Sequence, residues 1–195
     1  MVLDEHPDFF GQAVKEHAEV LGTVGSKLRK PFGELLEVCI KSIQNDGKIL
    51  FFGNGGSAAD AQHLATELTV RFRRDRAPIA SLALTTDTST LTAIGNDLGF
   101  QHLFSRQIEA LGKVGDVAVA ISTSGNSANV IEATKKARLC GLVTVAFTGN
   151  DGGQLSDLAD LALVVPSANT ARIQEMHIML GQILCGALEQ RLGLI

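Results

Sequence analysis

Five apolar runs recur along the chain from residue 48 onward, and segments with helical periodicity separate them. Each run is continuous rather than alternating and is rich in β-branched residues, at 48–52, 79–84, 117–121, 142–147 and 161–165. Strands that are buried on both faces have this pattern, and they belong to parallel sheets covered by helices. The pattern therefore predicts a three-layer, doubly wound α/β fold around a parallel sheet of about five strands.

Helical periodicity places helices between and after these runs, at 58–72, 91–94, 100–111, 128–139 and 171–191. Residues 7–45, before the first strand, have the same period, and we expect Gly22, Gly25 and Pro31 to break them into two or more helices. Such a helical arm either forms an oligomer surface or packs on its own sheet. No linker or repeat divides the chain, so residues 1–195 are predicted to form one domain, with an N-terminal helical arm (1–46) and an α/β core (47–195).

Composition and charge narrow the class of partner. The formal net charge of −4 disfavours a nucleic-acid or anionic-membrane partner, and most of the arginine cluster at 71–76 is typical of a solvated loop. No apolar run reaches the roughly 18 residues of a membrane span, and the N-terminus lacks the regions of a signal peptide. The three cysteines are widely spaced in apolar segments, which predicts reduced thiols in a cytoplasmic protein.

A hydroxyl-rich turn follows the third run and leads into a helical segment. It contains Ser122, Thr123, Ser124 and Ser127, and Gly125 lets the backbone take a positive φ or approach a ligand closely. The first N–H groups of a helix have no internal partner and carry partial positive charge, so this order of elements can bind a phosphate. The alternative is a serine cluster that only caps the helix, but four hydroxyls exceed what one cap needs.

A second glycine-rich turn, 53–57, follows the first run and contains Asn54, Gly55 and Ser57. Its glycine spacing differs from the dinucleotide-binding fingerprint, and it lacks the lysine of a Walker loop, so no nucleotide is expected. The carboxyl ends of parallel strands share one edge of the sheet, where the two turns can close on one small phosphorylated ligand.

Titratable and amide side chains follow on two of the predicted helices. His63 and Glu67 are four residues apart and share one helix face, and Asp60 lies one turn before His63. His63 and Glu67 are candidates for an acid–base pair, for two ligands of a divalent metal or for a surface ion pair. On the last helix, Gln174 and Gly181 share an apolar stripe with Gln182 at its edge. For His177, a hydrogen bond at the helix surface is favoured over a catalytic role.

The segments 53–71, 84–97, 121–130, 147–153 and 171–176 resemble the sugar isomerase (SIS) family. The similarity is greatest to bacterial members that interconvert sedoheptulose 7-phosphate and D-glycero-D-manno-heptose 7-phosphate through an enediol, for lipopolysaccharide-core synthesis. The resemblance implies a homotetramer with active sites between subunits. It also implies that Glu67 is the catalytic acid–base, and that substrate is bound by Asn54, Gly55, Ser57, Arg71, Asp97, Ser122, Thr123, Ser124, Ser127 and Gln174.

Zinc is the cofactor that the resemblance implies, with ligands equivalent to His63, Glu67, Gln174 and one more residue of the last helix. That residue is a histidine in the family, and here the position is Gln182, a poor fourth ligand for zinc. Glutamine offers a carbonyl oxygen or a hydrogen bond but cannot exchange a proton near neutral pH. Either Glu67 performs both proton transfers, or His177 or a metal-bound water substitutes, or activity is impaired.

The leading hypothesis is therefore a phosphosugar aldose–ketose isomerase. The alternative is a non-catalytic tetramer of the same fold that binds the replication initiator or senses a phosphosugar. The retained Glu67 favours the enzyme, whereas Gln182 favours the alternative.

Overall fold

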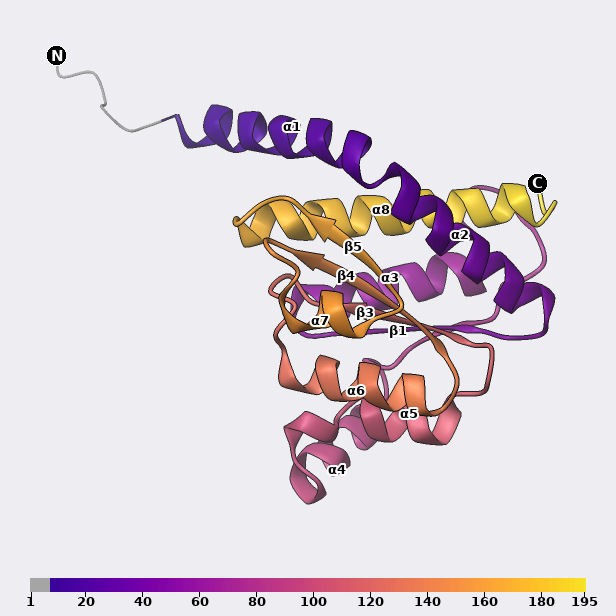
Figure 1. The fold of residues 1–195 in the computed structure, drawn as a ribbon. Helices are drawn as coiled ribbons and strands as arrows, with labels where there is room; N and C mark the ends of the chain where they lie inside the picture. Colours follow the sequence, from indigo (N-terminus) through magenta and orange to yellow (C-terminus); the bar gives the residue numbers. More distant parts are fainter. Residues whose placement is uncertain (1–7) are drawn as a thin grey trace, which may run out of the picture.

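All five predicted strands pair in one parallel sheet (Figure 1). The computed structural model describes residues 8–195. The strands are β1 (Ile49–Gly53), β2 (Ser81–Ala83), β3 (Val117–Ile121), β4 (Val143–Gly149) and β5 (Leu161–Val165), in the order β2-β1-β3-β4-β5. The chain leaves β1 toward β2 on one side and later adds β3, β4 and β5 on the other. This order confirms the doubly wound α/β prediction, and it makes the β1–β3 boundary the topological switch point.

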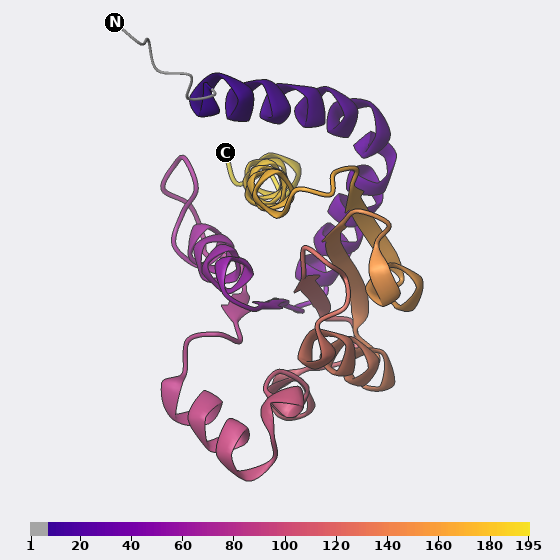
Figure 2. The same cartoon turned by 90° about the vertical axis from the view of Figure 1, so that its left-hand side faces the viewer.

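Helices cover both faces of the sheet (Figures 1 and 2). One layer contains α1 (Phe9–Lys27), α2 (Arg29–Gln44), α3 (Gly56–Thr69) and α8 (Thr170–Arg191), and the other contains α4 (Thr88–Asp97), η1 (Phe100–His102), α5 (Ser105–Leu111), α6 (Ala128–Leu139) and α7 (Gly153–Leu158). Each face of the sheet has its own apolar core. Along β1, Ile49 and Phe51 pack in the core beneath α2, α3 and α8, whereas Leu50 and Phe52 pack in the core beneath α4, α5 and α6. Burial on both faces is the reason that the strand reads as a continuous apolar run.

The N-terminal arm breaks at a different place from the one that we predicted. Gly22 and Gly25 lie inside α1, and the chain turns at Leu28 instead. Pro31 is the third residue of α2, where a missing N–H costs no helix hydrogen bond. A glycine lowers helix propensity by only about 1 kcal/mol, which the packing of α1 overrides. Two further differences are that the 100–111 segment divides into η1 and α5, and that α7 was not predicted.

Helix α1 lies on the outer side of α8 rather than on the sheet. Figure 2 views α8 end-on, between α1 and the sheet. His17 Nδ1 and Glu175 Oε2 are 2.7 Å apart, and Arg172 donates to the carbonyl of Ala13. Phe9 and Phe10 are nevertheless 81% and 79% exposed. In this single chain, the arm therefore leaves large apolar side chains in solvent.

No helix within residues 8–195 has both the length and the apolar character that a bilayer crossing requires.

Candidate functional site

The two glycine- and serine-rich turns are neighbours because β1 and β3 pair in register, with Gly53 opposite Ile121. A Cβ on Gly53 would lie 2.5 Å from the carbonyl oxygen of Ile121 and 2.7 Å from Cβ of Ser57. Only glycine allows the chain to leave β1 this close to β3 and to the first turn of α3. The sheet edge that the sequence predicted as the site is thus built at the switch point.

The hydroxyl-rich turn presents its side chains in a way that a helix cap would not. Ser127 is the N-cap residue of α6, yet its side chain makes no cap hydrogen bond. Its Oγ lies 3.1 Å from Oγ of Ser122, which is nearly fully buried. The first N–H groups of α6 have no partner within the helix. The simple capping alternative is therefore wrong for Ser127, and the hydroxyls and helix N–H groups together can hold an anion.

A second loop closes tightly against this turn. Gly125 has φ +64°, and a Cβ there would lie 2.0 Å from the carbonyl oxygen of Gly152. The side chain of Asn126 donates to the carbonyl of Ser124 and accepts from the N–H of Gln154. The start of α7, which the sequence did not predict, thus packs against the hydroxyl-rich turn and holds its backbone in place.

Asn54 is fixed by a partner that the sequence analysis did not single out. The side-chain amides of Asn54 and Asn129 exchange two hydrogen bonds of 2.8 Å each. Asn129 belongs to the first turn of α6 and is almost fully buried. The pair joins the two turns, and its only sequence signal is that Asn129 directly follows the hydroxyl-rich segment.

His63 and Glu67 share one face of α3, as their spacing predicted, and α8 adds Gln182 to this face. His63 Nε2 lies 3.2 Å from Glu67 Oε1, and the amide of Gln182 donates to the same ring nitrogen over 3.2 Å. The structure therefore brings together Glu67, His63 and the residue where this chain departs from the family pattern. His63 is about half exposed and Glu67 about one-fifth exposed, so the cluster is open to solvent on one side.

Gln174 reaches the same face one turn closer to the phosphate turn. Its amide donates to the carboxylate of Asp60, and its Oε1 lies 2.9 Å from where a Cβ on Gly56 would be. Burial raises the pKa of Asp60, while the hydrogen bond from Gln174 and the nearby His63 oppose that shift. Asp60 thus orients Gln174, a role that its position one turn before His63 in the sequence did not reveal. Gly181 lets α8 approach α3, since a Cβ there would lie 2.4 Å from a methyl group of Leu64.

His177 is not at the helix surface, contrary to the favoured interpretation. Its side chain is fully buried, and its Nε2 donates to the carbonyl of Thr148 over 3.1 Å. Burial lowers the pKa of His177 to about 4. A neutral imidazole sealed in the core cannot exchange protons with a ligand at the open face, so it does not replace the family histidine.

Two predicted substrate residues stand apart from the rest in a single chain. Arg71 is exposed just after α3, and Asp97 is exposed at the end of α4, where its carboxylate accepts from Asn96 over 2.7 Å. Within residues 8–195, no hydrogen bond joins either of them to another candidate residue. Their place in the site stays a prediction.

The donor atoms available to a metal are few. The described part of the chain contains no group of three or more His, Cys, Asp or Glu side chains arranged for a metal ion. The predicted zinc set would consist of one imidazole from His63, one carboxylate from Glu67 and the amide oxygens of Gln174 and Gln182. Zinc prefers nitrogen, sulfur and carboxylate ligands, so this set fits it in part and weakly.

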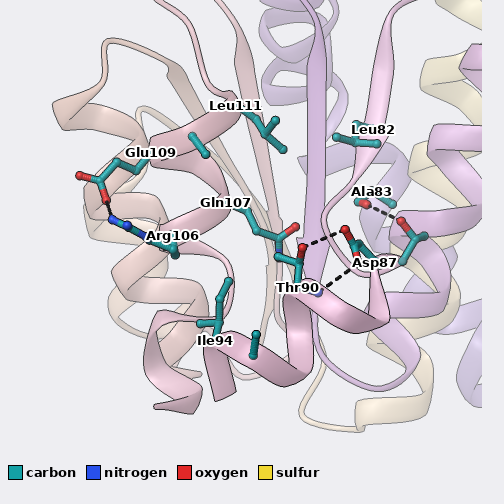
Figure 3. A pocket seen from close by; sticks show the side chains of 12 residues that line it. Leu82, Ala83, Asp87, Thr90, Ile94, Arg106, Gln107, Glu109 and Leu111 are labelled. Carbon is teal, nitrogen blue, oxygen red and sulfur yellow. Dashed lines mark hydrogen bonds and ion pairs between the residues drawn. The ribbon is translucent and has the colours of Figure 1, made fainter. Parts of the chain in front are cut away.

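A separate hollow lies between the edge strand β2 and helices α4 and α5 (Figure 3). Leu82, Ile94 and Leu111 give it apolar walls, and Thr90 bonds to Asp87 at one end. None of the predicted site residues is among those that line it. The candidate site is therefore the switch-point edge with the α3–α8 face, not this hollow.

Comparison with known proteins shows the family to which this chain belongs. The SIS domain family matches residues 14–149. A phosphoheptose isomerase from Paramagnetospirillum magneticum is 58% identical over 93% of this chain and 94% of its own length. The structure of phosphoheptose isomerase from Neisseria gonorrhoeae matches with a TM-score of 0.88 and 47% identity over 93% of this chain and 97% of that chain. A phosphoheptose isomerase structure from Francisella tularensis matches with a TM-score of 0.91 and 33% identity over 94% and 97%.

Proposed function

Because this chain belongs to the SIS domain family, and within it to the phosphoheptose isomerases, we propose that it interconverts sedoheptulose 7-phosphate and D-glycero-D-manno-heptose 7-phosphate. The observation that carries the proposal is the anion cradle at the start of α6. There, the hydroxyls of Ser122 and Ser127 face each other and are not used to cap the helix. The product of the forward reaction would supply heptose for the lipopolysaccharide core.

The site is extended along α3, which suits an open-chain sugar. Ser57 and Glu67 are ten residues apart on one helix, about 15 Å along its axis. Held by its phosphate at the serine end, the chain of carbons runs past Asn54 and Gln174 toward Glu67. A long linear substrate uses this whole face, whereas a closed ring would not.

Glu67 performs the chemistry in this proposal. Its carboxylate removes the proton from the carbon next to the carbonyl and returns it to the neighbouring carbon after the enediol forms. Since Gln182 cannot exchange a proton and His177 is buried, Glu67 also moves the proton between the two oxygens. General acid–base assistance of this kind is worth typically 10²- to 10⁴-fold in rate.

The test is turnover of sedoheptulose 7-phosphate, followed by NMR, alongside calorimetric binding of the same sugar. We expect Glu67→Gln to abolish turnover and keep binding, and Ser122→Ala to weaken binding. Near-full activity in Glu67→Gln would contradict the mechanism. If the unmodified protein neither binds nor converts the sugar, the proposed function is wrong.

We also propose weak zinc binding at His63 and Glu67, completed by amide oxygens of Gln174 and Gln182. Bound zinc would act as a Lewis acid that polarises the sugar carbonyl. Metal analysis of the purified protein and zinc titration by calorimetry test this. Zinc affinity equal to that of a Gln182→His variant would contradict the claim that the amide weakens the site.

The assembly that we propose is a cytoplasmic homotetramer with active sites between subunits. Exposed Phe9, Phe10 and Val14 on α1 support an interface there, and subunit contacts would bring Arg71 and Asp97 to a neighbour's site. Light scattering after gel filtration measures the oligomeric state of Phe10→Ser, which we expect to be smaller than a tetramer. Val114→Ser removes an equally exposed valine from a distant turn and serves as the control. A tetramer that survives Phe10→Ser unchanged would count against this interface.

Gln182 favours one alternative hypothesis, in which the protein is a tetramer that binds a phosphosugar without catalysis. Under that hypothesis, the chain binds sedoheptulose 7-phosphate while neither the unmodified protein nor Gln182→His turns it over. A pull-down with the replication initiator then separates an initiator-binding role from a sensor role.

A further inference from the structure

One arginine closes the C-terminal end of the helix that carries Glu67. Arg76 lies in the loop between α3 and β2, and its Nη2 donates to the carbonyl of Glu67 over 2.8 Å. Its Nη1 donates to the carbonyl of Leu68 over 2.7 Å. The last carbonyls of a helix have no partner within it and carry partial negative charge, so a guanidinium there satisfies both needs.

The same guanidinium also fixes this end of α3 to α8. Arg76 Nε donates to Glu189 Oε1 over 2.9 Å, and the N–H of Phe72 donates to the same oxygen over 2.9 Å. Both side chains of the ion pair are 0% exposed. Three segments therefore meet at Arg76: the last turn of α3, the loop that follows it, and α8, which packs against α3.

Stability alone does not explain a buried pair of this kind. Removing two charges from water is costly, and replacing such a pair by well-packed apolar side chains is often neutral or stabilising. Within residues 8–195, Glu189 Oε2 has no hydrogen-bond partner, which adds to the cost. What the pair supplies is geometry, because the planar guanidinium donates in fixed directions to one carboxylate and to three carbonyls, those of Glu67, Leu68 and Ala77.

The Arg76–Glu189 pair fixes the position of the face that carries Glu67, His63 and Gln182. Glu67 has its carbonyl in the guanidinium fork and its carboxylate against His63. Glu189 is two turns along α8 from Gln182, which contacts the same histidine. A shift or rotation of the last turn of α3 would move the carboxylate of Glu67 relative to the substrate, and catalytic groups need placement to within roughly 0.5 Å.

We propose that Arg76, with Glu189 as its counterion, is a positioning residue for Glu67. It touches neither substrate nor reacting atoms, and it acts by fixing the main chain of the base. This inference rests on the proposed function, because it assumes that Glu67 is the base.

The decisive experiment is the double variant Arg76→Met/Glu189→Leu. It removes both buried charges together and leaves neither one uncompensated, so the fold and the melting temperature should be largely kept. Steady-state kinetics with sedoheptulose 7-phosphate should show kcat lowered about 100-fold, the order expected for a misplacement of about 1 Å. KM and the calorimetric affinity for the sugar should stay within about twofold, because the phosphate is bound at the other end of α3.

Lys48→Met is the matched control. Lys48 Nζ pairs with the buried Asp116 over 2.5 Å just before β1, at the opposite edge of the sheet from the site. We expect this variant to lower the melting temperature without lowering kcat. It therefore distinguishes general destabilisation from displaced catalysis.

Each outcome of these measurements either supports or overturns the positioning role of Arg76. A folded double variant with unchanged kcat overturns the positioning role, whereas a loss of kcat with intact sugar binding supports it. If the double variant fails to fold, Arg76→Lys carries the test, because lysine keeps the charge but cannot span the carbonyls and Glu189. Unchanged kcat in Arg76→Lys would then overturn the inference. No turnover by the unmodified protein would instead overturn the proposed function, and the inference with it.

Discussion

Replacing Gly125 by alanine should damage both the stability and the phosphate binding of this protein. The residue has φ +64°, where an alanine costs roughly 1–2 kcal/mol. Its new Cβ would also lie 2.0 Å from the carbonyl oxygen of Gly152, a backbone atom that cannot swing aside. Relieving that contact means separating the two loops, and overpacking of this kind costs typically about 1–3 kcal/mol.

Gly115→Ala isolates the steric part of this prediction. Gly115 also has a positive φ, +89°, but a Cβ there would meet no atom within 4 Å. At roughly 2–4 °C per kcal/mol for a chain of this size, Gly125→Ala should lose about 4–20 °C in melting temperature and Gly115→Ala about 2–8 °C. Circular dichroism measures both, under conditions where unfolding is reversible.

Sugar binding separates the two variants further. Because Gly125 lies between the hydroxyls of Ser122 and Ser127, moving the loops should weaken calorimetric binding of sedoheptulose 7-phosphate about tenfold or more, which is 1.4 kcal/mol. Gly115→Ala should bind like the unmodified protein. Equal melting temperatures and equal affinities for the two variants would refute the reasoning from the Gly152 contact.

Three other outcomes follow from the same structure. Gln182→His should raise both kcat for the heptose phosphate and zinc affinity; an unchanged or lower kcat in NMR turnover would show that the glutamine is compensated. His177, whose pKa falls from 6.5 to about 4 on burial, binds fewer protons folded than unfolded, so stability should fall as the pH drops from about 6.5 toward 4. Urea unfolding of His177→Gln should show a weaker pH dependence across that range, and an identical one would remove His177 as its cause. Burial raises the pKa of Cys185 to about 12 and that of Cys39 as well, so a thiol reagent should modify only the partly exposed Cys140 in the folded protein, as mass spectrometry can count.

Local pattern was enough to predict the layers and to locate the two glycine- and serine-rich turns. The β3 run and its helix were predicted to the residue because a strand buried on both faces is apolar throughout and the next helix has its own period. The turns were recognisable because glycine and hydroxyl residues between a strand and a helix are a local sequence signal. Helix ends were less certain, since Gly22 and Gly25 weaken a helix locally but α8 packs against it.

Only the tertiary structure decided which distant side chains meet. Arg76 and Glu189 are 113 positions apart, and Gln182 and His63 are 119 apart, so no spacing rule connects them. Their contacts depend on the close approach of α8 to α3 at Gly181, which is a property of packed surfaces. The packing of α8 on β4 buries His177, which a helix-face argument left at the surface, against Phe147 and the carbonyl of Thr148. Sequence period decides which face of an element is apolar, whereas the fit between two such faces decides which polar groups at their edges become partners.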